Sequence, residues 1–389
     1  MIERTLEAAI IRGLNAFPAV VLLGPRQVGK TTLAKQLASK LKKGTHYIDL
    51  ERPSSVAAIN RDPEAYFSAY QEQCVIIDEV QRIPTLFPLL RSLIDEKREP
   101  GRFIITGSAS PDLLKGASES LAGRVMYSYL NPIALHELPD KIRLKQHWLH
   151  GGFPTPLLMR SATVRFDWMD SFITTYIERD LPLLFDVRFS SSVMRRLWRM
   201  LAHMNGAILN AENVGNSLDI SGTTLKRYID FLEGAFIIRR LPPFFKNSGK
   251  RLIKAPKVYI NDSGILHFLL DIHSEKDIVN HPSIGASWEG YVISQIVYAK
   301  NSRLDAYYYR THAGAECDLV LSKGEEVKAA IEIKYSKAPV LKKGFYNSVA
   351  DLKPLQTFVI TPFEVDFVSK DEIRMVGLTI FISKYLPDL

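Results

Sequence analysis

The feature that most constrains this chain is the segment "GPRQVGKTT" at residues 24–32. It directly follows the apolar run "AVVLL" and directly precedes the helix-like run "LAKQLASKLKK". A strand that passes through two glycines into a helix leaves backbone N–H groups without ordinary partners. These donors, together with the positive end of the helix, suit a phosphate group. The segment therefore predicts a phosphate-binding loop, and a glycine-rich turn without a ligand is the alternative.

Gly24, Gly29, Lys30 and Thr31 fit the pattern G-x-x-x-x-G-K-[ST], with a strand before it and a helix after it. The glycines let the backbone close around the β-phosphate, Lys30 neutralises the β and γ oxygens, and Thr31 binds Mg²⁺. We therefore expect ATP and Mg²⁺ as cofactors. The expected nucleotide-binding residues are Gly24, Pro25, Arg26, Gln27, Val28, Gly29, Lys30, Thr31 and Thr32, with Asp78 from a later strand.

Two further apolar runs end in polar side chains that suit hydrolysis of a triphosphate. "CVIIDEV" ends in Asp78 and Glu79 at the expected carboxyl end of a buried strand, where open α/β sheets hold ligands. Asp78 is expected to hold Mg²⁺, and Glu79 to polarise the attacking water as a general base. "RFIITGS" ends in Ser108, which is expected to sense the γ-phosphate or orient the water, with Thr106 as the weaker candidate. A capped strand end is the structural alternative.

The order of elements indicates an α/β protein of more than one domain. Strand-like and helix-like runs alternate through about residue 135, which predicts a parallel sheet covered by helices, and one of these helices is expected over residues 30–42. A length of 389 residues exceeds one ordinary core. Neither Cys74 nor Cys317 has a spacing typical of a disulfide framework or thiolate zinc site. No apolar run reaches the roughly 20 residues of a membrane span, and the N-terminus lacks the apolar core of a signal peptide, so we expect a cytoplasmic protein.

Residues 160–240 are expected to form a helical unit, and it lies within a basic stretch made up of residues 160–257. That stretch holds 16 Lys and Arg against nine Asp and Glu. Two helical pieces are broken around residues 220–222, where Ser221 is placed to cap the second. A helix-turn-helix of this kind would put Thr223, Thr224, Lys226 and Arg227 near a nucleic-acid groove. Winged-helix shapes also serve as lids or subunit contacts, and the charge alone suits a solvated face equally well.

The blocks "GPRQVGKTTLA", "VIIDEVQ", "FIITGS" and "LAGRV" resemble a prokaryotic family of AAA-type ATPases with a C-terminal domain of no established function. The resemblance implies an additional strand between the P-loop strand and the acidic strand, and a homo-oligomer, possibly a ring. It implies Arg124 of "LAGRV" as an arginine finger or sensor from a neighbouring subunit. A surface arginine is the alternative. "YIERDL" also matches the family, and its Arg179 and Asp180 either reach the nucleotide or form an ion pair.

Near the C-terminus, "AIEIKYS" places Glu332 and Lys334 on one face of an apolar strand. Asp318 follows an expected hairpin bend at residues 313–315, and Glu289 lies on a preceding helix. This order is similar to the PD-(D/E)xK restriction-endonuclease-like superfamily. The resemblance implies that Asp318 and Glu332 bind Mg²⁺, that Lys334 activates water or stabilises the pentavalent phosphate, and that Glu289 assists. No proline precedes Asp318, and Glu316 offers a competing carboxylate.

The sequence thus predicts three domains: an AAA-type ATPase core at 1–140, a helical lid or winged-helix-like unit at 141–270, and a nuclease-like domain at 271–389. The predicted function is Mg²⁺-dependent ATP hydrolysis coupled to DNA binding or processing. The alternative is a nucleotide-driven switch or scaffold whose inactive C-terminal domain binds a protein or nucleic acid. A nucleotide kinase would share the P-loop, but the Asp-Glu pair argues against it.

Overall fold

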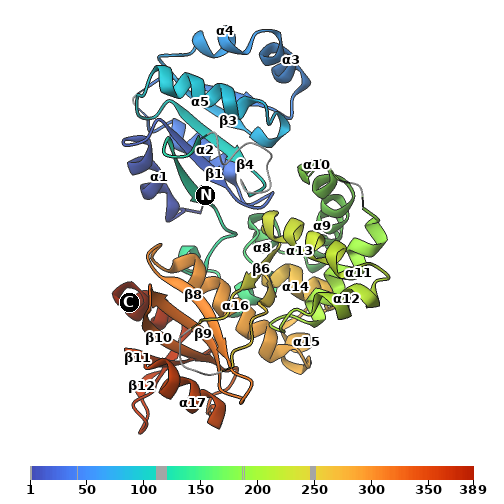
Figure 1. The fold of residues 1–389 in the computed structure, drawn as a ribbon, viewed down its shortest axis with the longest axis vertical. Helices are drawn as coiled ribbons and strands as arrows, with labels where there is room; N and C mark the ends of the chain where they lie inside the picture. Colours follow the sequence, from blue (N-terminus) through green and yellow to red (C-terminus); the bar gives the residue numbers. More distant parts are fainter. Residues whose placement is uncertain (1, 42, 111–120, 186, 188, 246–250) are drawn as a thin grey trace.

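A computed structural model of the chain describes residues 2–41, 43–110, 121–185, 187, 189–245 and 251–389. It has three parts, which Figure 1 shows in sequence colours. The α/β core lies at the top of that view, the helical unit at the right, and a mixed α/β domain at the bottom.

The core is built on a five-stranded sheet in the order β2-β3-β4-β1-β5, in which all strand pairs are parallel. β4 lies between β1 and β3, which confirms the expected additional strand. β1, β3 and β4 are buried along their whole length, as their apolar runs predict. The strands are β1 (Ala19–Leu23), β2 (Thr45–Asp49), β3 (Cys74–Asp78), β4 (Phe103–Gly107) and β5 (Val125–Tyr129).

The helices of the core connect these strands. α2 begins at the P-loop and packs against β3 and β4 through Leu33, Ala34 and Leu37. It ends at Ala38, earlier than the expected helix over 30–42, because the chain turns there toward Gly44 and the start of β2. The helices are α1 (Leu6–Leu14), α2 (Lys30–Ala38), α3 (Pro53–Arg61), α4 (Pro63–Ser68), the 3₁₀ turn η1 (Val80–Arg82) and α5 (Leu86–Glu96).

The helical unit follows and contains the expected helix-turn-helix. α12 ends at Ser217, and α13 begins at Gly222 after a short turn. Ser221 caps α13, because its Oγ accepts the Thr224 N–H at 3.1 Å, as predicted. The elements are η3 (Leu135–Glu137), α7 (Leu144–His150), α8 (Pro154–Leu158), α9 (Ala162–Thr175), the π-helical η4 (Tyr176–Asp180), α10 (Leu181–Phe185), α11 (Ser191–His203), α12 (Ala211–Ser217), α13 (Gly222–Gly234), the antiparallel pair β6 (Ile238–Leu241) and β7 (Lys257–Ile260), α14 (Ser263–Leu269) and α15 (Glu275–Asn280).

The C-terminal domain has the expected mixed sheet, in the order β12-β13-β11-β10-β9-β8. β10, β11 and β13 run parallel, whereas β8, β9 and β12 are antiparallel to their neighbours. The expected hairpin bend joins β8 to β9. The elements are α16 (Ile284–Ala299), β8 (Asp305–Arg310), β9 (Glu316–Lys323), β10 (Glu326–Ile333), α17 (Lys343–Leu352), β11 (Gln356–Thr361), β12 (Asp366–Val368), β13 (Arg374–Gly377), α18 (Leu378–Ile380), the π-helical η5 (Phe381–Tyr385) and the 3₁₀ turn η6 (Leu386–Asp388).

A buried polar junction connects the helical unit to α16. Ser287 on α16 accepts the Trp148 Nε1–H at 3.0 Å and lies 2.6 Å from His267 Nε2. Close helix packing makes this junction possible, because a Cβ on Gly264 of α14 would lie 2.2 Å from the His150 carbonyl oxygen. Only a glycine allows α14 to approach the end of α7 this closely.

Gly264→Ala is therefore expected to destabilise the chain by about 1–3 kcal/mol, because a backbone oxygen cannot move away from the added methyl group. Gly285→Ala is the matched control, since nothing lies within 4 Å of a Cβ at that helical glycine. It is expected to be neutral or stabilising by about 0.4–1 kcal/mol. Thermal and urea unfolding of both variants test this, and equal stability of the two would contradict the packing argument.

Candidate functional site

The loop between β1 and α2 has the backbone shape that its glycines predict. Gly24 and Gly29 have φ of 151° and 97°, and Gln27 also lies at a positive φ of 68°. A Cβ on Gly24 would lie 2.1 Å from the Leu130 carbonyl oxygen, so the loop passes too close to the end of β5 for any side chain. The loop is thereby held at the carboxyl edge of the sheet, where ligands of open α/β sheets bind.

Lys30 points back into this loop and is only 5% exposed. Its Nζ donates to the carbonyl oxygens of Gly24 and Pro25 and to Ser108 Oγ, each at 2.9 Å. Burial lowers the pKa of Lys30 to about 8, although the carboxylates of Glu79 and Asp78 oppose that shift. The ammonium thus lies where the sequence predicts a charge for phosphate oxygens.

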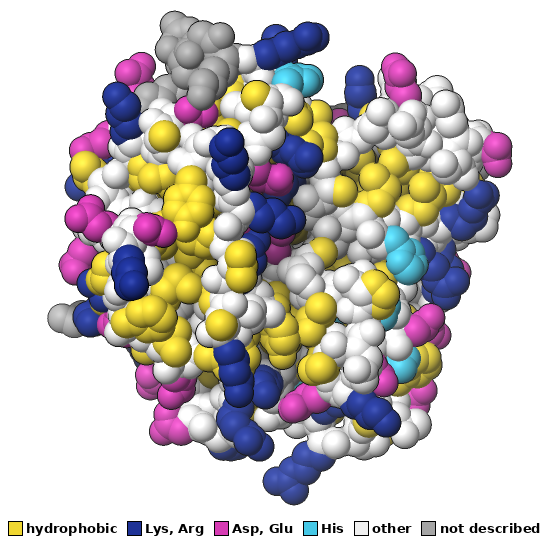
Figure 2. Space-filling model, turned by 90° about the horizontal axis from the view of Figure 1, so that it is seen from below, with side chains coloured by type: hydrophobic (Ala, Val, Ile, Leu, Met, Phe, Trp, Pro, Cys, Tyr) yellow, Lys and Arg dark blue, Asp and Glu magenta, His cyan; other side chains and the backbone are white. Residues whose placement is uncertain are grey.

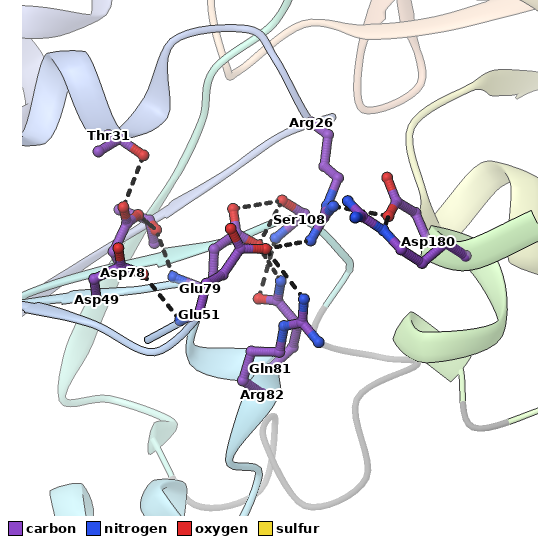
Figure 3. Close-up of polar contacts among 12 residues, drawn as sticks. Arg26, Thr31, Asp49, Glu51, Asp78, Glu79, Gln81, Arg82, Ser108 and Asp180 are labelled. Carbon is purple, nitrogen blue, oxygen red and sulfur yellow. Dashed lines mark hydrogen bonds and ion pairs between the residues drawn. The ribbon is translucent and has the colours of Figure 1, made fainter. Parts of the chain in front are cut away.

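Asp78 forms the centre of a hydroxyl cluster at the end of β3. Its Oδ2 accepts Thr31 Oγ1–H at 2.8 Å and the Tyr47 hydroxyl at 2.7 Å, and its Oδ1 accepts the Thr106 hydroxyl. The Thr31–Asp78 bond, which Figure 3 shows, brings together the two residues predicted to hold Mg²⁺. Hydroxyl and carboxylate oxygens are ligands that suit this ion. Burial and the bond to Asp78 raise the pKa of Tyr47.

Glu79 follows Asp78 with a left-handed backbone (φ 59°, ψ 49°), which is uncommon for a non-glycine residue. Its carboxylate oxygens accept Ser108 Oγ–H at 3.0 and 3.1 Å, and one of them also accepts the Gln81 side-chain amide. Because Lys30 donates to the same Ser108 hydroxyl, a chain of hydrogen bonds runs from Lys30 through Ser108 to Glu79. The structure therefore brings together these three predicted residues.

Arg26 extends from the P-loop toward the helical unit (Figure 3). Its guanidinium forms ion pairs with Asp180 Oδ1 and with Glu51 Oε1, both at 2.8 Å. Arg179 also contacts Asp180, at 3.2 Å. Asp180 is buried at the end of the π-helical η4, a type of irregularity that is frequent at functional sites. Asp180 therefore forms an ion pair, which was the alternative to a contact with the nucleotide, and Arg26 is its main partner.

Arg124 is paired within the chain. Its Nε and Nη2 donate to the two carboxylate oxygens of Asp95 on α5, both at 2.7 Å. A bidentate pair of this kind fixes the orientation of the guanidinium. Action of Arg124 in a neighbouring subunit stays a prediction, and it requires this pair to open.

A cavity of about 200 Å³ lies beside the P-loop. Thr32, Leu33 and Gln36 of α2 form one part of its lining, and Pro154 and Leu158 of α8 another. Arg4 also borders the cavity and is fixed in place, because it donates to the carbonyl oxygens of Val28 and Asn131. The lining is mainly apolar, which suits a flat hydrophobic group.

The residues predicted for the nuclease-like site also come together. Lys334 Nζ lies 2.6 Å from Glu332 Oε1, and Asp318 Oδ2 accepts the Ile333 N–H at 2.9 Å. Burial raises the pKa of Asp318 well above its usual range, and the carboxylates of Glu289 and Glu332 add to the effect. Burial also raises the pKa of Glu332. The group thus combines buried carboxylates at the edge of β9 and β10.

Lys257 lies among these carboxylates, and the sequence did not predict it. Its Nζ is 3.2 Å from Glu289 Oε1 and 3.8 Å from Asp318 Oδ1. In the part of the chain that the structure describes, no three His, Cys, Asp or Glu side chains are arranged to hold a metal ion. The residues at this position therefore do not fit the predicted Mg²⁺ site.

The helix-turn-helix leaves the predicted residues of α13 accessible. Thr223, Lys226 and Arg227 are exposed, and the Arg227 guanidinium lies 5.3 Å from the Phe231 ring. By contrast, the face of the molecule seen from below in Figure 2 carries Lys and Arg interspersed with Asp and Glu. That face therefore lacks a continuous basic surface of the kind that nucleic acids favour.

Three family models match the chain. Residues 16–139 match an AAA domain, and residues 141–276 and 284–381 match two domains of unknown function, DUF8612 and DUF4143. Two relatives, "Uncharacterized protein Rv2008c" of Mycobacterium tuberculosis and "Uncharacterized protein Mb2031c" of Mycobacterium bovis, are each 39% identical to the chain over 377 residues. The match covers 97% of the chain and 84% of each relative. The chain belongs to the family of these mycobacterial proteins.

A solved structure of another protein resembles the fold of this chain. "The Walker-type ATPase PABY2304 of Pyrococcus abyssi" superposes with a TM-score of 0.50 and 16% identity, over 69% of this chain and 96% of that one. The AAA domain and this likeness confirm the AAA-type P-loop ATPase fold of the core. Within the described residues, we find no helix whose length and apolar character would let it span a bilayer.

Sequence reasoning missed several residues of this family member's site. Tyr47 contacts Asp78 from the neighbouring strand, and Gln81 contacts Glu79 from the turn after β3. β2 pairs with β3 in parallel, so that Asp49 lies beside Asp78. A side chain near the carboxyl end of β2, such as Tyr47, could therefore have been expected near Asp78. Gln81 lies only two residues after Glu79 in the same turn.

Proposed function

We propose that this protein is a Mg²⁺-dependent ATPase and that the P-loop edge of the core sheet is its active site. The observation that carries the proposal is the hydrogen-bond chain Lys30–Ser108–Glu79 beside the Thr31–Asp78 pair. One cation, two hydroxyls and two carboxylates are groups that suit phosphoryl transfer to water. They come from the P-loop and from the ends of β3 and β4.

Each of these residues has a role in the proposed reaction. Lys30 exchanges its two carbonyl acceptors for oxygens of the β- and γ-phosphates, and the N–H groups of the loop bind the β-phosphate. Thr31 and Asp78 would hold Mg²⁺, which would neutralise charge on the phosphate oxygens. Glu79 accepts the proton of the attacking water, and Ser108 senses the γ-phosphate from its position between Glu79 and Lys30.

Lys30→Ala is expected to abolish ATP binding, whereas Glu79→Gln keeps binding but slows hydrolysis by about 10²–10⁴-fold. The reason is that Lys30 supplies charge to the bound phosphates, and Glu79 acts only on water. Calorimetry with Mg²⁺ and ATP measures binding, and phosphate release measures turnover. Lys40→Ala is the control, since Lys40 pairs with Glu7 outside the loop. Equal loss of binding in the Lys30 and Glu79 variants would show that the role of Glu79 is wrong.

We further propose that the cavity between α2 and α8 accepts the nucleotide base. It begins at Gly29 and Thr32 of the P-loop and α2, so a nucleotide whose phosphates lie in the loop can extend into it. Pro154 and Leu158 supply apolar surface from the helical unit. Binding of the base would then involve both the core and the helical unit.

Leu158→Trp is expected to fill this cavity and to weaken ATP binding at least tenfold, or about 1.4 kcal/mol. Binding of inorganic tripolyphosphate is expected to stay unchanged, because it does not use the cavity. Leu355→Trp is the control, since Leu355 is also an exposed leucine and directly precedes β11 of the C-terminal domain. Parallel calorimetric titrations with both ligands measure this. A parallel loss for both ligands would contradict a base pocket.

For the C-terminal domain we propose the switch or scaffold alternative over cleavage. The observation that favours it is Lys257, which contacts the carboxylates predicted to bind Mg²⁺. DNA binding through the exposed side chains of α13, and Arg124 acting in an oligomer, stay predictions.

Supercoiled plasmid incubated with the wild-type chain and Mg²⁺ is expected to stay intact, because phosphodiester cleavage by buried carboxylates depends on a bound metal ion. Gel electrophoresis of the plasmid measures this, with Glu332→Ala as the background. Nicking that Glu332→Ala abolishes and Lys30→Ala retains would make the domain a nuclease instead.

A further inference from the structure

Lys257 belongs to the helical unit, but its side chain lies in the acidic cluster of the C-terminal domain. It is the first residue of β7, which pairs with β6 in a separate two-stranded sheet. Its side chain is only 5% exposed. A buried ammonium needs acceptors on several sides, and here they come from α16 and β9.

The contacts of Lys257 surround its ammonium with carboxylates. Nζ lies 3.2 Å from Glu289 Oε1, 3.4 Å from Glu316 Oε1 and 3.8 Å from Asp318 Oδ1. Tyr259, on the same strand, donates its hydroxyl to the same oxygen of Glu289 at 2.6 Å. β7 therefore contributes two side chains to this cluster, and both orient Glu289.

The charges in the cluster explain why a cation is required there. Four carboxylates, including Glu332, face two ammonium groups, and Lys334 is already paired with Glu332. Removal of Lys257 would take the nearest cation away from Glu289 and from the buried Asp318, whereas Glu316 would keep Arg310 at 3.7 Å. A divalent ion with carboxylate ligands would satisfy the same demand, but it cannot share the position with an ammonium.

We propose that Lys257 is an internal cation that occupies the acidic site of the C-terminal domain and keeps divalent metal ions out of it. This inference deepens the proposed non-cleaving role of that domain. It attributes the proposed lack of metal binding at this site to one side chain from another part of the fold. Metal binding would then require the ammonium of Lys257 to leave its contacts with these carboxylates.

The test measures Mn²⁺ binding by the full-length chain without nucleotide, using the electron paramagnetic resonance signal of free Mn²⁺. Lys257→Met keeps the length of the side chain and removes its charge. This variant is expected to bind one Mn²⁺ more than the wild type, with at least tenfold higher affinity at that site. The double variant Lys257→Met with Asp318→Asn is expected to lose this ion, which assigns it to the cluster and not to the P-loop.

Lys254→Met is the matched control, because Lys254 is an exposed lysine three residues earlier in the same segment. It is expected to bind Mn²⁺ as the wild type does. The proposal would be overturned if Lys257→Met and the wild type bound the same number of Mn²⁺ ions with the same affinity, or if neither bound any. If Lys257→Met does not unfold cooperatively, Lys257→Gln replaces it. The proposal would also be overturned if the wild type bound a Mn²⁺ ion that the substitution Asp318→Asn removes. ATP hydrolysis is not a readout here, so failure of this proposal leaves the ATPase proposal intact.

Discussion

The nucleotide site depends on the buried ammonium of Lys30 and its three oxygen acceptors. Two acceptors are carbonyl groups of the P-loop, and the third is the hydroxyl of Ser108 after β4. Because an unpaired buried charge is costly, these contacts hold the loop against the edge of the sheet. Ser108 in turn donates to Glu79, so one charge sets the relative positions of the loop and of two strand ends.

Most of the core could be predicted from the sequence because its signals are local. The apolar runs give β1, β3 and β4, and parallel strands bring their carboxyl ends to one edge. Glu79 and Ser108 are therefore expected to meet, although 29 residues separate them. The contact of Tyr47 and the Arg26–Asp180 pair were harder to predict from the sequence. The first depends on the strand order, and the second on the position of a separate helical unit.

The contacts of the C-terminal domain could be predicted from the sequence only in part. Strand alternation predicts that Glu332 and Lys334 share one face, and their ion pair agrees with it. A pattern within β9 and β10 holds no information about a side chain that arrives from β7. Lys257 reaches Asp318 only because the three-dimensional fold places the two-stranded sheet beside the mixed sheet. The resemblance to a metal-dependent site therefore predicted the carboxylates but not the cation among them.

The Arg26–Asp180 ion pair links the P-loop to the helical unit. Arg26 lies within the P-loop, and its guanidinium contacts the core through Glu51 and the helical unit through Asp180. The position of the helical unit therefore bears on the side chain of a P-loop residue. Any displacement of Asp180 would alter the surroundings of the Arg26 guanidinium, and with them the charge at the mouth of the loop.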